Sequence, residues 1–287
     1  MSAMTAMTAM TANTAVDRQT AEVWAQLASV TDPELDEPVT ELGFIMHVDV
    51  DAQGSVQIGF RLPTYWCAAN FAFLMADDMR VAVAGLPWVT KVKIGLGEHM
   101  YADEINRGVA AGRSFQDTFG AEASGELEDI RRTFMVKAFQ RRQEALLTSL
   151  LEHGLEPARL VRMSVAELAG LPCDSAGRRL VERYLERRPI VGYGTHDAAH
   201  ASELAFVGSD GALLDPNGLG AYLRALRRVG VNAEFNSALC RGLLAARYGD
   251  ADAAAPQVEI KPVHFVPVSD WKRGVGLSQT GNTAASV

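Results

Sequence analysis

Cys67 is the residue of this chain whose position most directly favours chemistry. It ends the stretch 64–67 (TYWC), which follows Pro63 and precedes a segment with helical spacing from about Ala68. The first N–H groups of a helix have no partner within the helix, and the helix dipole favours an anion there. A thiolate should therefore form more easily at Cys67, where it can act as a nucleophile or as a soft-metal ligand. A small buried hydrophobic residue is the alternative interpretation of the same cysteine.

A second group with possible chemistry is His196 and His200, followed by Glu203. On a helix, two imidazoles four residues apart share one face, as pairs of zinc ligands do. This spacing predicts, as an alternative function, a metal-dependent hydrolase-like enzyme that uses both histidines. The glycine-containing run 192–194 just before them indicates a loop, for which two solvated histidines are the simpler interpretation.

Alternating polar and apolar residues predict the elements that position Cys67. Two strands, at 46–51 and 55–62, are joined by the short turn 52–54, and Pro63 ends the second strand. One face of that second strand is apolar throughout: Val56, Ile58, Phe60 and Leu62. The hairpin should therefore bury one face.

Helical spacing at about 16–29 and from about Ala68, with a third alternating segment at 89–96, completes the order αββαβ. Beyond residue 100 the pattern is mainly helical, and the fold class predicted is α+β. The predicted helices there span about 102–111, 125–153, 219–229 and 237–248, with a short helix that the capping box 164–167 begins and residues 170–172 end, and an arginine-rich helix at 178–188. Arginines of the segment 178–188 either pair with acidic residues of this chain, which we favour, or with a partner.

Composition limits the classes of function. The chain has 287 residues, 48% hydrophobic and 22% charged, with a net charge of −8, which argues against a nucleic-acid partner. No apolar run is long enough to span a membrane. The expected organisation is a disordered leader at 1–15, an α/β domain at 16–100, a helical region at 101–250 and an extended tail at 251–287. Three cysteines, Cys67, Cys173 and Cys240, argue against a disulfide framework and for a reducing cytoplasm.

The stretches 31–35 (TDPEL) and 39–43 (VTELG), followed by Thr64 three residues before Cys67, resemble the metal-sulfur cluster assembly family, which includes PaaD-like and SufT-like proteins. The resemblance covers about 17–96. It implies a role in assembling or delivering iron-sulfur or iron centres, with Cys67 as the functional residue and Asp32 and Glu34 accompanying it. This chain departs from the family pattern by placing Ala68 after the cysteine instead of proline.

The function expected from this resemblance is that of a non-enzymatic, chaperone-like accessory factor that matures a metalloenzyme apoprotein, its protein client. A [4Fe–4S] cluster held by cysteine alone needs about four thiolates, and Cys67 is the one thiolate of the matching segment. A tightly bound cofactor is therefore not expected, whereas transient iron or a cluster shared with the client or a homodimer is. Region 101–250 would recognise the client. Extended members of the family suggest a soluble diiron monooxygenase as that client, with iron delivery or folding assistance as the role.

Overall fold

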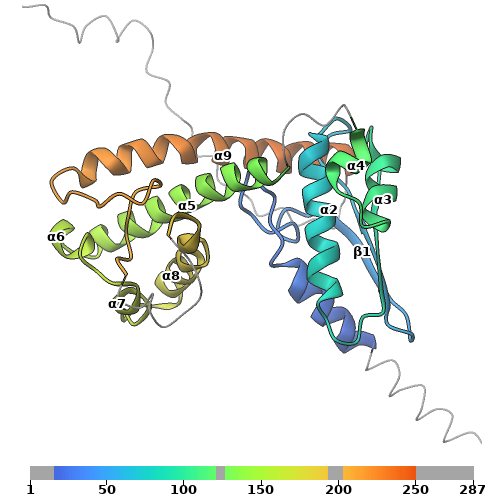
Figure 1. Cartoon of the computed structure of the whole chain (residues 1–287), viewed down its shortest axis with the longest axis horizontal. Coiled ribbons are helices and arrows are strands. Elements are labelled where there is room, and N and C mark those ends of the chain that lie inside the picture. Colours follow the sequence, from blue (N-terminus) through green and yellow to red (C-terminus); the bar gives the residue numbers. More distant parts are fainter. Residues whose placement is uncertain (1–15, 121–126, 193–202, 250–287) are drawn as a thin grey trace, which may run out of the picture. The chain divides into compact units, whose positions relative to one another are not determined.

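The computed structural model describes residues 16–120, 127–192 and 203–249, which lie within one compact unit (Figure 1). The first helix covers residues 16–27. The elements that follow are β1 (Ile45–Val50), β2 (Ser55–Phe60), α2 (Ala69–Ala84), β3 (Lys91–Leu96), α3 (Ala102–Ala110), α4 (Phe115–Phe119), α5 (Leu127–Glu152), α6 (Pro157–Leu160), α7 (Val165–Ala169), α8 (Ser175–Arg187), the 3₁₀ helix η2 (Arg188–Val191) and α9 (Leu219–Tyr248). The predicted leader and tail lie outside the described residues.

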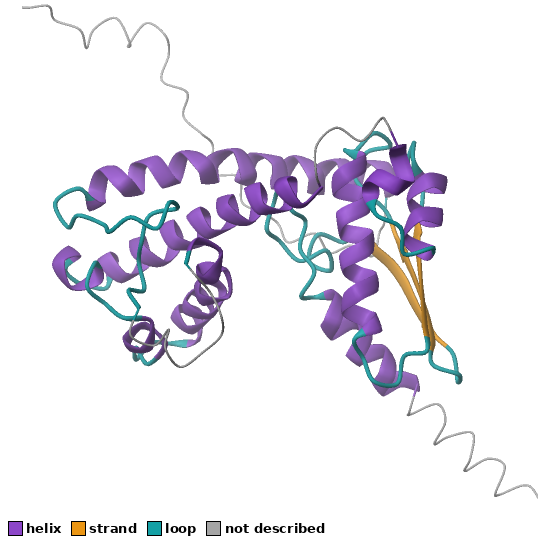
Figure 2. Ribbon diagram, in the orientation of Figure 1, coloured by secondary structure: helices purple, strands orange, loops and turns teal. Residues whose placement is uncertain are grey.

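The N-terminal region has the predicted αββαβ order, which confirms the α+β prediction (Figure 2). Strand β1 pairs antiparallel with β2, and β2 pairs parallel with β3, in the sheet order β1-β2-β3. The hairpin turn forms because the Asp51 carboxylate accepts N–H bonds from Gln53 and Ser55, while Gly54 adopts a positive φ of 78°. Helix α2 is the crossover that the parallel β2–β3 pair requires.

A first hydrophobic core lies between this sheet and its helices. The alternating residues of β2 are fully buried in it, together with residues of the first helix and of α2. Helices α3 and α4 also belong to this core through Ile105, Val109 and Phe115. The Asn106 side chain further ties α3 to β3, because it bonds both the N–H and the C=O of Leu96. The expected boundary near residue 100 therefore falls within one packed core.

A second core organises the helical region around α5, α8 and the segment 205–207. Tyr184 stacks on Phe206 with ring centroids 5.3 Å apart and donates a hydrogen bond to the carbonyl of Ala205. The buried Gln143 amide donates to the carbonyl of Val207 and accepts from the Tyr222 hydroxyl. The predicted capping box of Ser164 and Glu167 begins α7.

Helix α9 differs from expectation, because one 30-residue helix replaces the two predicted at 219–229 and 237–248. Between those two segments, Gly230 and Ala233 are buried. A Cβ added at Gly230 would lie 3.9 Å from Arg141 Cγ, an ordinary van der Waals distance, so this part of α9 packs directly on α5. Tertiary packing on α5 therefore keeps the helix continuous. Among the described helices, none combines the length and apolar character that a membrane crossing requires.

Candidate functional site

The Asp-Pro-Glu turn, residues 32–37, is a tightly bonded local structure. Asp32 Oδ1 accepts hydrogen bonds from the N–H groups of Glu34 (2.8 Å) and Leu35 (2.9 Å). The Asp36 N–H donates to the Asp32 carbonyl, and the Asp32 N–H donates to the Glu37 carbonyl, both at 2.9 Å. Asp32 begins the turn because its short carboxylate satisfies the first free N–H groups. Its side chain is thereby held inside the protein, where Asp32 is 7% exposed.

The loop that ends at Cys67, residues 64–67, is hydrogen-bonded to the segment 99–101. His99 Nε2 lies 2.8 Å from the Cys67 carbonyl, and the Tyr101 N–H donates to His99 Nδ1 at 3.2 Å. Because Nδ1 accepts, Nε2 carries the proton and donates to Cys67. Burial lowers the pKa of His99, which favours this neutral form. The Met100 N–H also donates to the Tyr65 carbonyl at 2.9 Å, so two hydrogen bonds fix the loop.

The expectation of an easily formed thiolate at Cys67 was wrong. Helix α2 begins at Ala69, two residues after Cys67, and Ala68 is its N-cap. Burial raises the pKa of the Cys67 thiol to about 12, and the nearby Asp32 and Cys240 raise it further, whereas only the Ala68 N–H opposes them. Desolvation therefore outweighs the helix terminus. Cys67 is a protonated thiol at neutral pH, and a metal must displace that proton to bind.

Cys240 lies beside this site although α9 is far away in sequence. One turn before it, Asn236 Nδ2 donates to Glu34 Oε1 at 3.0 Å, and one turn after it, Leu244 is buried in the first core. Burial raises the pKa of Cys240 to about 11, and Asp32 and Glu34 contribute to the rise. Nothing in the sequence connects Cys240 with Cys67. Helical spacing places Cys240 on the same face as Leu244, but no local signal identifies what that face packs against.

The structure thus brings three predicted residues into one neighbourhood. Asp32 and Glu34 both act electrostatically on Cys67 and on Cys240. Within the described ranges, no three His, Cys, Asp or Glu side chains converge to hold a metal ion. His196 and His200 lie outside the described residues, so their proposed metal site has no structural description.

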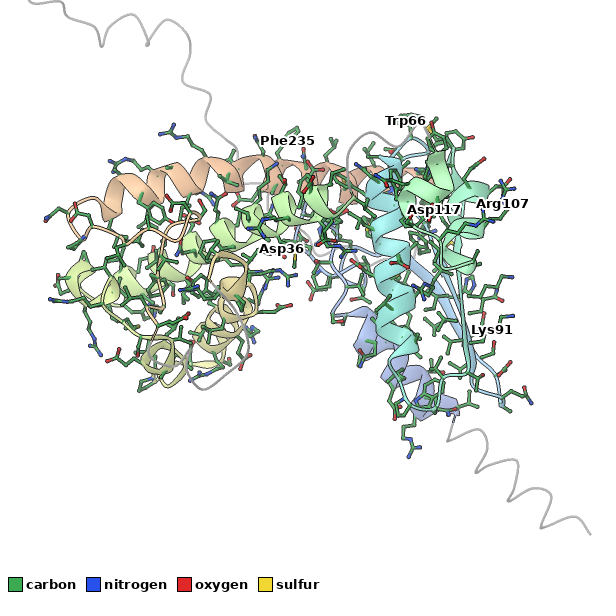
Figure 3. The ribbon with its side chains drawn as sticks, viewed as in Figure 1. Asp36, Trp66, Lys91, Arg107, Asp117 and Phe235 are labelled. Atoms are coloured by element: carbon green, nitrogen blue, oxygen red, sulfur yellow. The ribbon has the colours of Figure 1, made fainter. Side chains whose placement is uncertain are left out.

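The opposite end of the turn is a buried ion-pair network around Asp36. Arg142 binds Asp36 through two hydrogen bonds, at 2.6 and 2.7 Å, and also binds Glu186 at 2.7 Å. Arg183 and Arg187 of α8 approach the same carboxylate within 3.7 and 3.8 Å. Figure 3 shows Asp36 next to α5. Arg183 and Arg187 thus pair with an acidic residue of their own chain, as favoured from the sequence. Arg178 and Arg188 of the same segment instead donate to backbone carbonyls.

Exposed apolar side chains flank Cys67 on its outer side. Trp66 is 73% exposed, and its neighbour Tyr65 and the adjoining Met100 are also exposed. Figure 3 shows Trp66 at the edge of the N-terminal region, away from Asp36. Exposed aromatic residues and methionine are enriched at protein–protein contacts. The loop therefore offers a contact surface around the thiol.

Residues 20–94 match the family described as iron-sulfur cluster assembly protein. The match confirms the resemblance found in the sequence.

Two relatives match a similar share of this chain. The iron-sulfur cluster carrier protein of Mycobacterium leprae (strain TN) is 34% identical over 82 residues, which are 29% of this chain and 21% of that protein. An uncharacterized protein of Methanocaldococcus jannaschii is 29% identical over 85 residues, which are 30% of this chain and 87% of that protein. The chain therefore spans about a fifth of the length of the first relative, and the similarity to both covers less than a third of this chain.

Proposed function

We propose that this protein is an accessory maturation factor that holds iron or an iron-sulfur cluster transiently at Cys67 and passes it to a metalloenzyme apoprotein. The observation that carries the proposal is the position of Cys67. His99 fixes its loop, Asp32 and Cys240 lie behind it, and the exposed Trp66 lies beside it. Such a thiol is held in place on a surface suited to protein contact. The cysteines are all free, which suits a reducing cytoplasm.

This protein does not coordinate the iron or cluster with its own residues alone. A cluster held by cysteine alone needs about four thiolates, and the described residues offer two in this neighbourhood. The client, or a second copy of the chain in a homodimer, supplies the remaining ligands. Because both thiols are protonated at neutral pH, binding is coupled to proton release and remains reversible.

The helical region is the part that we propose recognises the client. The outward face of α9 carries four exposed apolar side chains spaced four residues apart: Val231, Phe235, Leu239 and Leu243. Phe235 is 67% exposed, and Figure 3 shows it on the outer side of α9. A face of this kind packs against the apolar stripe of another helix. We propose a client helix as its occupant, and a soluble diiron monooxygenase as the client class, with iron for its carboxylate-bridged site as the cargo.

The test is maturation of the client in cells, together with anaerobic pull-down of the tagged protein and metal and sulfide analysis of the eluate. Wild type should activate the client and retain its apoprotein, whereas Cys67→Ala should retain the apoprotein and fail to activate it. Cys173→Ala is the matched control, because Cys173 is exposed and lies outside this neighbourhood. Full activation by a stably folded Cys67→Ala protein would remove the thiol from the mechanism.

The recognition surface has its own experiment. Phe235→Glu combined with Leu239→Glu should abolish retention of the client without lowering the melting temperature, since both side chains are exposed. Leu213→Glu, another exposed apolar position, is the control. If the double variant instead converts a dimer to a monomer and still retains the client, the face serves self-association and the assignment to the client is wrong.

A further inference from the structure

Strand β1 forms one edge of the sheet, and no strand of the described residues covers its outer side. The sheet order β1-β2-β3 leaves β1 paired with β2 alone. At the other edge, Asn106 of α3 bonds both the N–H and the C=O of Leu96, so β3 is partly capped. Strand β1 contains neither proline nor lysine, two residues that commonly block an edge against further pairing. The edge that remains open to another strand is therefore β1.

The hydrogen-bond pattern of the hairpin shows which backbone groups of β1 face this open edge. The Asp51 N–H donates to the Ser55 carbonyl at 3.0 Å, so these two residues form a hydrogen-bonded pair. Hydrogen-bonded and non-hydrogen-bonded pairs alternate along an antiparallel ladder. Asp49 therefore bonds to β2 as Asp51 does, whereas Val48 and Val50 direct their N–H and C=O groups away from β2. Within the described ranges, no other backbone group bonds to them.

The sequence of β1 is complementary to a second copy of itself in one antiparallel register. When two copies pair about Val48, His47 of one copy faces Asp49 of the other, and this contact occurs twice because the arrangement is symmetric. Val48 directs its backbone groups outward, so this register uses the open groups. Positions 47 and 49 then form a non-hydrogen-bonded pair, in which facing side chains lie closest. Both side chains are exposed, at 44% and 72%, so the imidazole can donate to the carboxylate across the two strands.

The neighbouring registers are each unfavourable. Centring the pair on either neighbour of Val48 directs the wrong backbone groups at the second copy, because these neighbours bond β2 instead. Centring on Val50 places Asp49 opposite Asp51 of the other copy, and like charges directly opposite are destabilising. Centring on Met46 falls on the β-bulge at the start of β1, where the regular ladder is interrupted. Charge and hydrogen-bond pattern therefore both select the register about Val48.

We propose that this protein forms a symmetric homodimer in which two β1 strands pair antiparallel about Val48 and join the two three-stranded sheets into one. The paired segment is short, since the β-bulge ends it on one side and the hairpin turn on the other. An edge contact of this length buries little surface, so the dimer is reversible and depends on protein concentration. It uses none of the side chains of α9 that we assign to the client, and it does not depend on the proposed function.

The register is tested by exchanging the two facing side chains in the full chain. His47→Asp places two carboxylates opposite each other at both contacts, and should weaken dimerisation at least about tenfold in sedimentation velocity over a range of protein concentrations. His47→Asp combined with Asp49→His restores the facing pairs and should restore the dimer. Lys91→Glu is the matched control, because Lys91 is also an exposed charged residue of the sheet but lies on β3, and this variant should dimerise as wild type does.

Hydrogen exchange followed by NMR spectroscopy gives a second measurement that needs no substitution. The N–H groups of Val48 and Val50 should be protected at high protein concentration and exchange at least about tenfold faster after dilution, because only the second copy bonds them. The N–H of Asp49 bonds β2 within the same chain and should stay protected at both concentrations. This alternation distinguishes pairing at the β1 edge from association through any other surface.

The inference is overturned if wild type stays monomeric at every concentration, if a folded His47→Asp protein dimerises as wild type does, or if the double exchange does not restore the dimer. A dimer lost only when Phe235→Glu and Leu239→Glu are combined uses α9, and protection of Val48 only after the client is added means that a client strand occupies the edge. Both results also reject the homodimer through β1. If His47→Asp fails to fold, the exchange of wild type alone decides the question.

Discussion

Asp32 and Asp36 lie four residues apart in one turn, are equally removed from solvent, and have opposite surroundings. Asp36, 4% exposed, is bound by Arg142 and approached by Arg183 and Arg187. Asp32, 7% exposed, accepts hydrogen bonds from two backbone N–H groups and lies near the acidic Glu34 and Glu37, while the Arg141 guanidinium acts on it only at longer range. Burial raises the pKa of Asp32 to about 6. Asp36 therefore joins the N-terminal region to the helical region, whereas Asp32 lies where its ionised form is disfavoured.

The two aspartates therefore have different roles: Asp36 holds two regions of the chain together, whereas Asp32 belongs to the candidate functional site. Buried ion pairs with good geometry fix one arrangement of the chain, and the arginines of α5 and α8 do so at Asp36. A buried carboxylate that forms no ion pair within the described residues has a perturbed pKa of the kind that clusters at functional sites. The helical region thus contributes arginines at one end of the turn and a thiol at the other.

The largest expected effect is at the joint. Asp36→Asn keeps a residue that tolerates the positive φ of 55° but leaves buried Arg142 without its main counterion. The free energy of unfolding should fall by about 3–5 kcal/mol, measured by urea denaturation. Asp78→Asn is the control, because its ion pair with Arg131 is partly exposed and should be worth less than about 1 kcal/mol. Equal losses of unfolding free energy in the two variants would show that the Asp36 network does not hold the two regions together.

Asp32→Asn should act in the opposite direction. Because the folded-state pKa lies near 6 and the usual value is 3.8, folding favours the protonated acid, and its stabilisation is fully present below pH 3.8 and lost as pH rises through 6. Asparagine can still accept both turn N–H bonds. The variant should therefore be more stable than wild type by roughly 1–3 kcal/mol at pH 7.5 and equal to it at pH 3.5, by denaturant unfolding at both values. A loss at pH 7.5 would mean that the ionised carboxylate has a stabilising partner.

His99→Ala should loosen the Cys67 loop, with a loss of roughly 1–2 kcal/mol for the missing hydrogen bonds. Hydrogen exchange of the backbone around Tyr65 to Cys67 should become faster than in wild type. Because the folded-state pKa of His99 is lowered, its stabilising contribution is present above its usual value of 6.5 and lost as pH falls through the lower folded-state value. Wild-type exchange, corrected for the intrinsic pH effect, should therefore approach that of the variant under acid conditions. Unchanged exchange in His99→Ala would show that the loop is held by other contacts.

The smallest effect on stability is expected at Cys67 itself. Cys67→Ser and Cys67→Ala should unfold within about 1 kcal/mol of wild type, because the side chain is small and half-buried. Both variants should nevertheless fail in client maturation. A pronounced loss in the serine variant alone would indicate a structural cysteine whose replacement buries an unpaired hydroxyl.

The parts of the fold that depend on local patterning were predictable. Alternation in β2 identified its buried face, and Pro63 marked its end, because both effects act within a few residues. The continuity of α9 was not predictable, since it depends on packing against α5, which is remote in sequence. For the site, Asp32, Glu34 and Cys67 came from the family resemblance, whereas Cys240 and the high pKa of Cys67 arise from tertiary burial. The arginines of α8 were expected to pair within the chain, but periodicity did not identify Asp36 as their partner.

The contribution of α9 to the first core has a consequence for the order of events during synthesis. Cys240 and Leu244 leave the ribosome long after the Cys67 loop, because Cys240 follows Cys67 by 173 positions. At translation rates of about 5–20 residues per second, this interval lasts roughly 9–35 s. Until α9 arrives, the nascent N-terminal region presents Cys67 without that cover. The thiol is thus accessible to small molecules in the cell before α9 packs beside it in the finished protein.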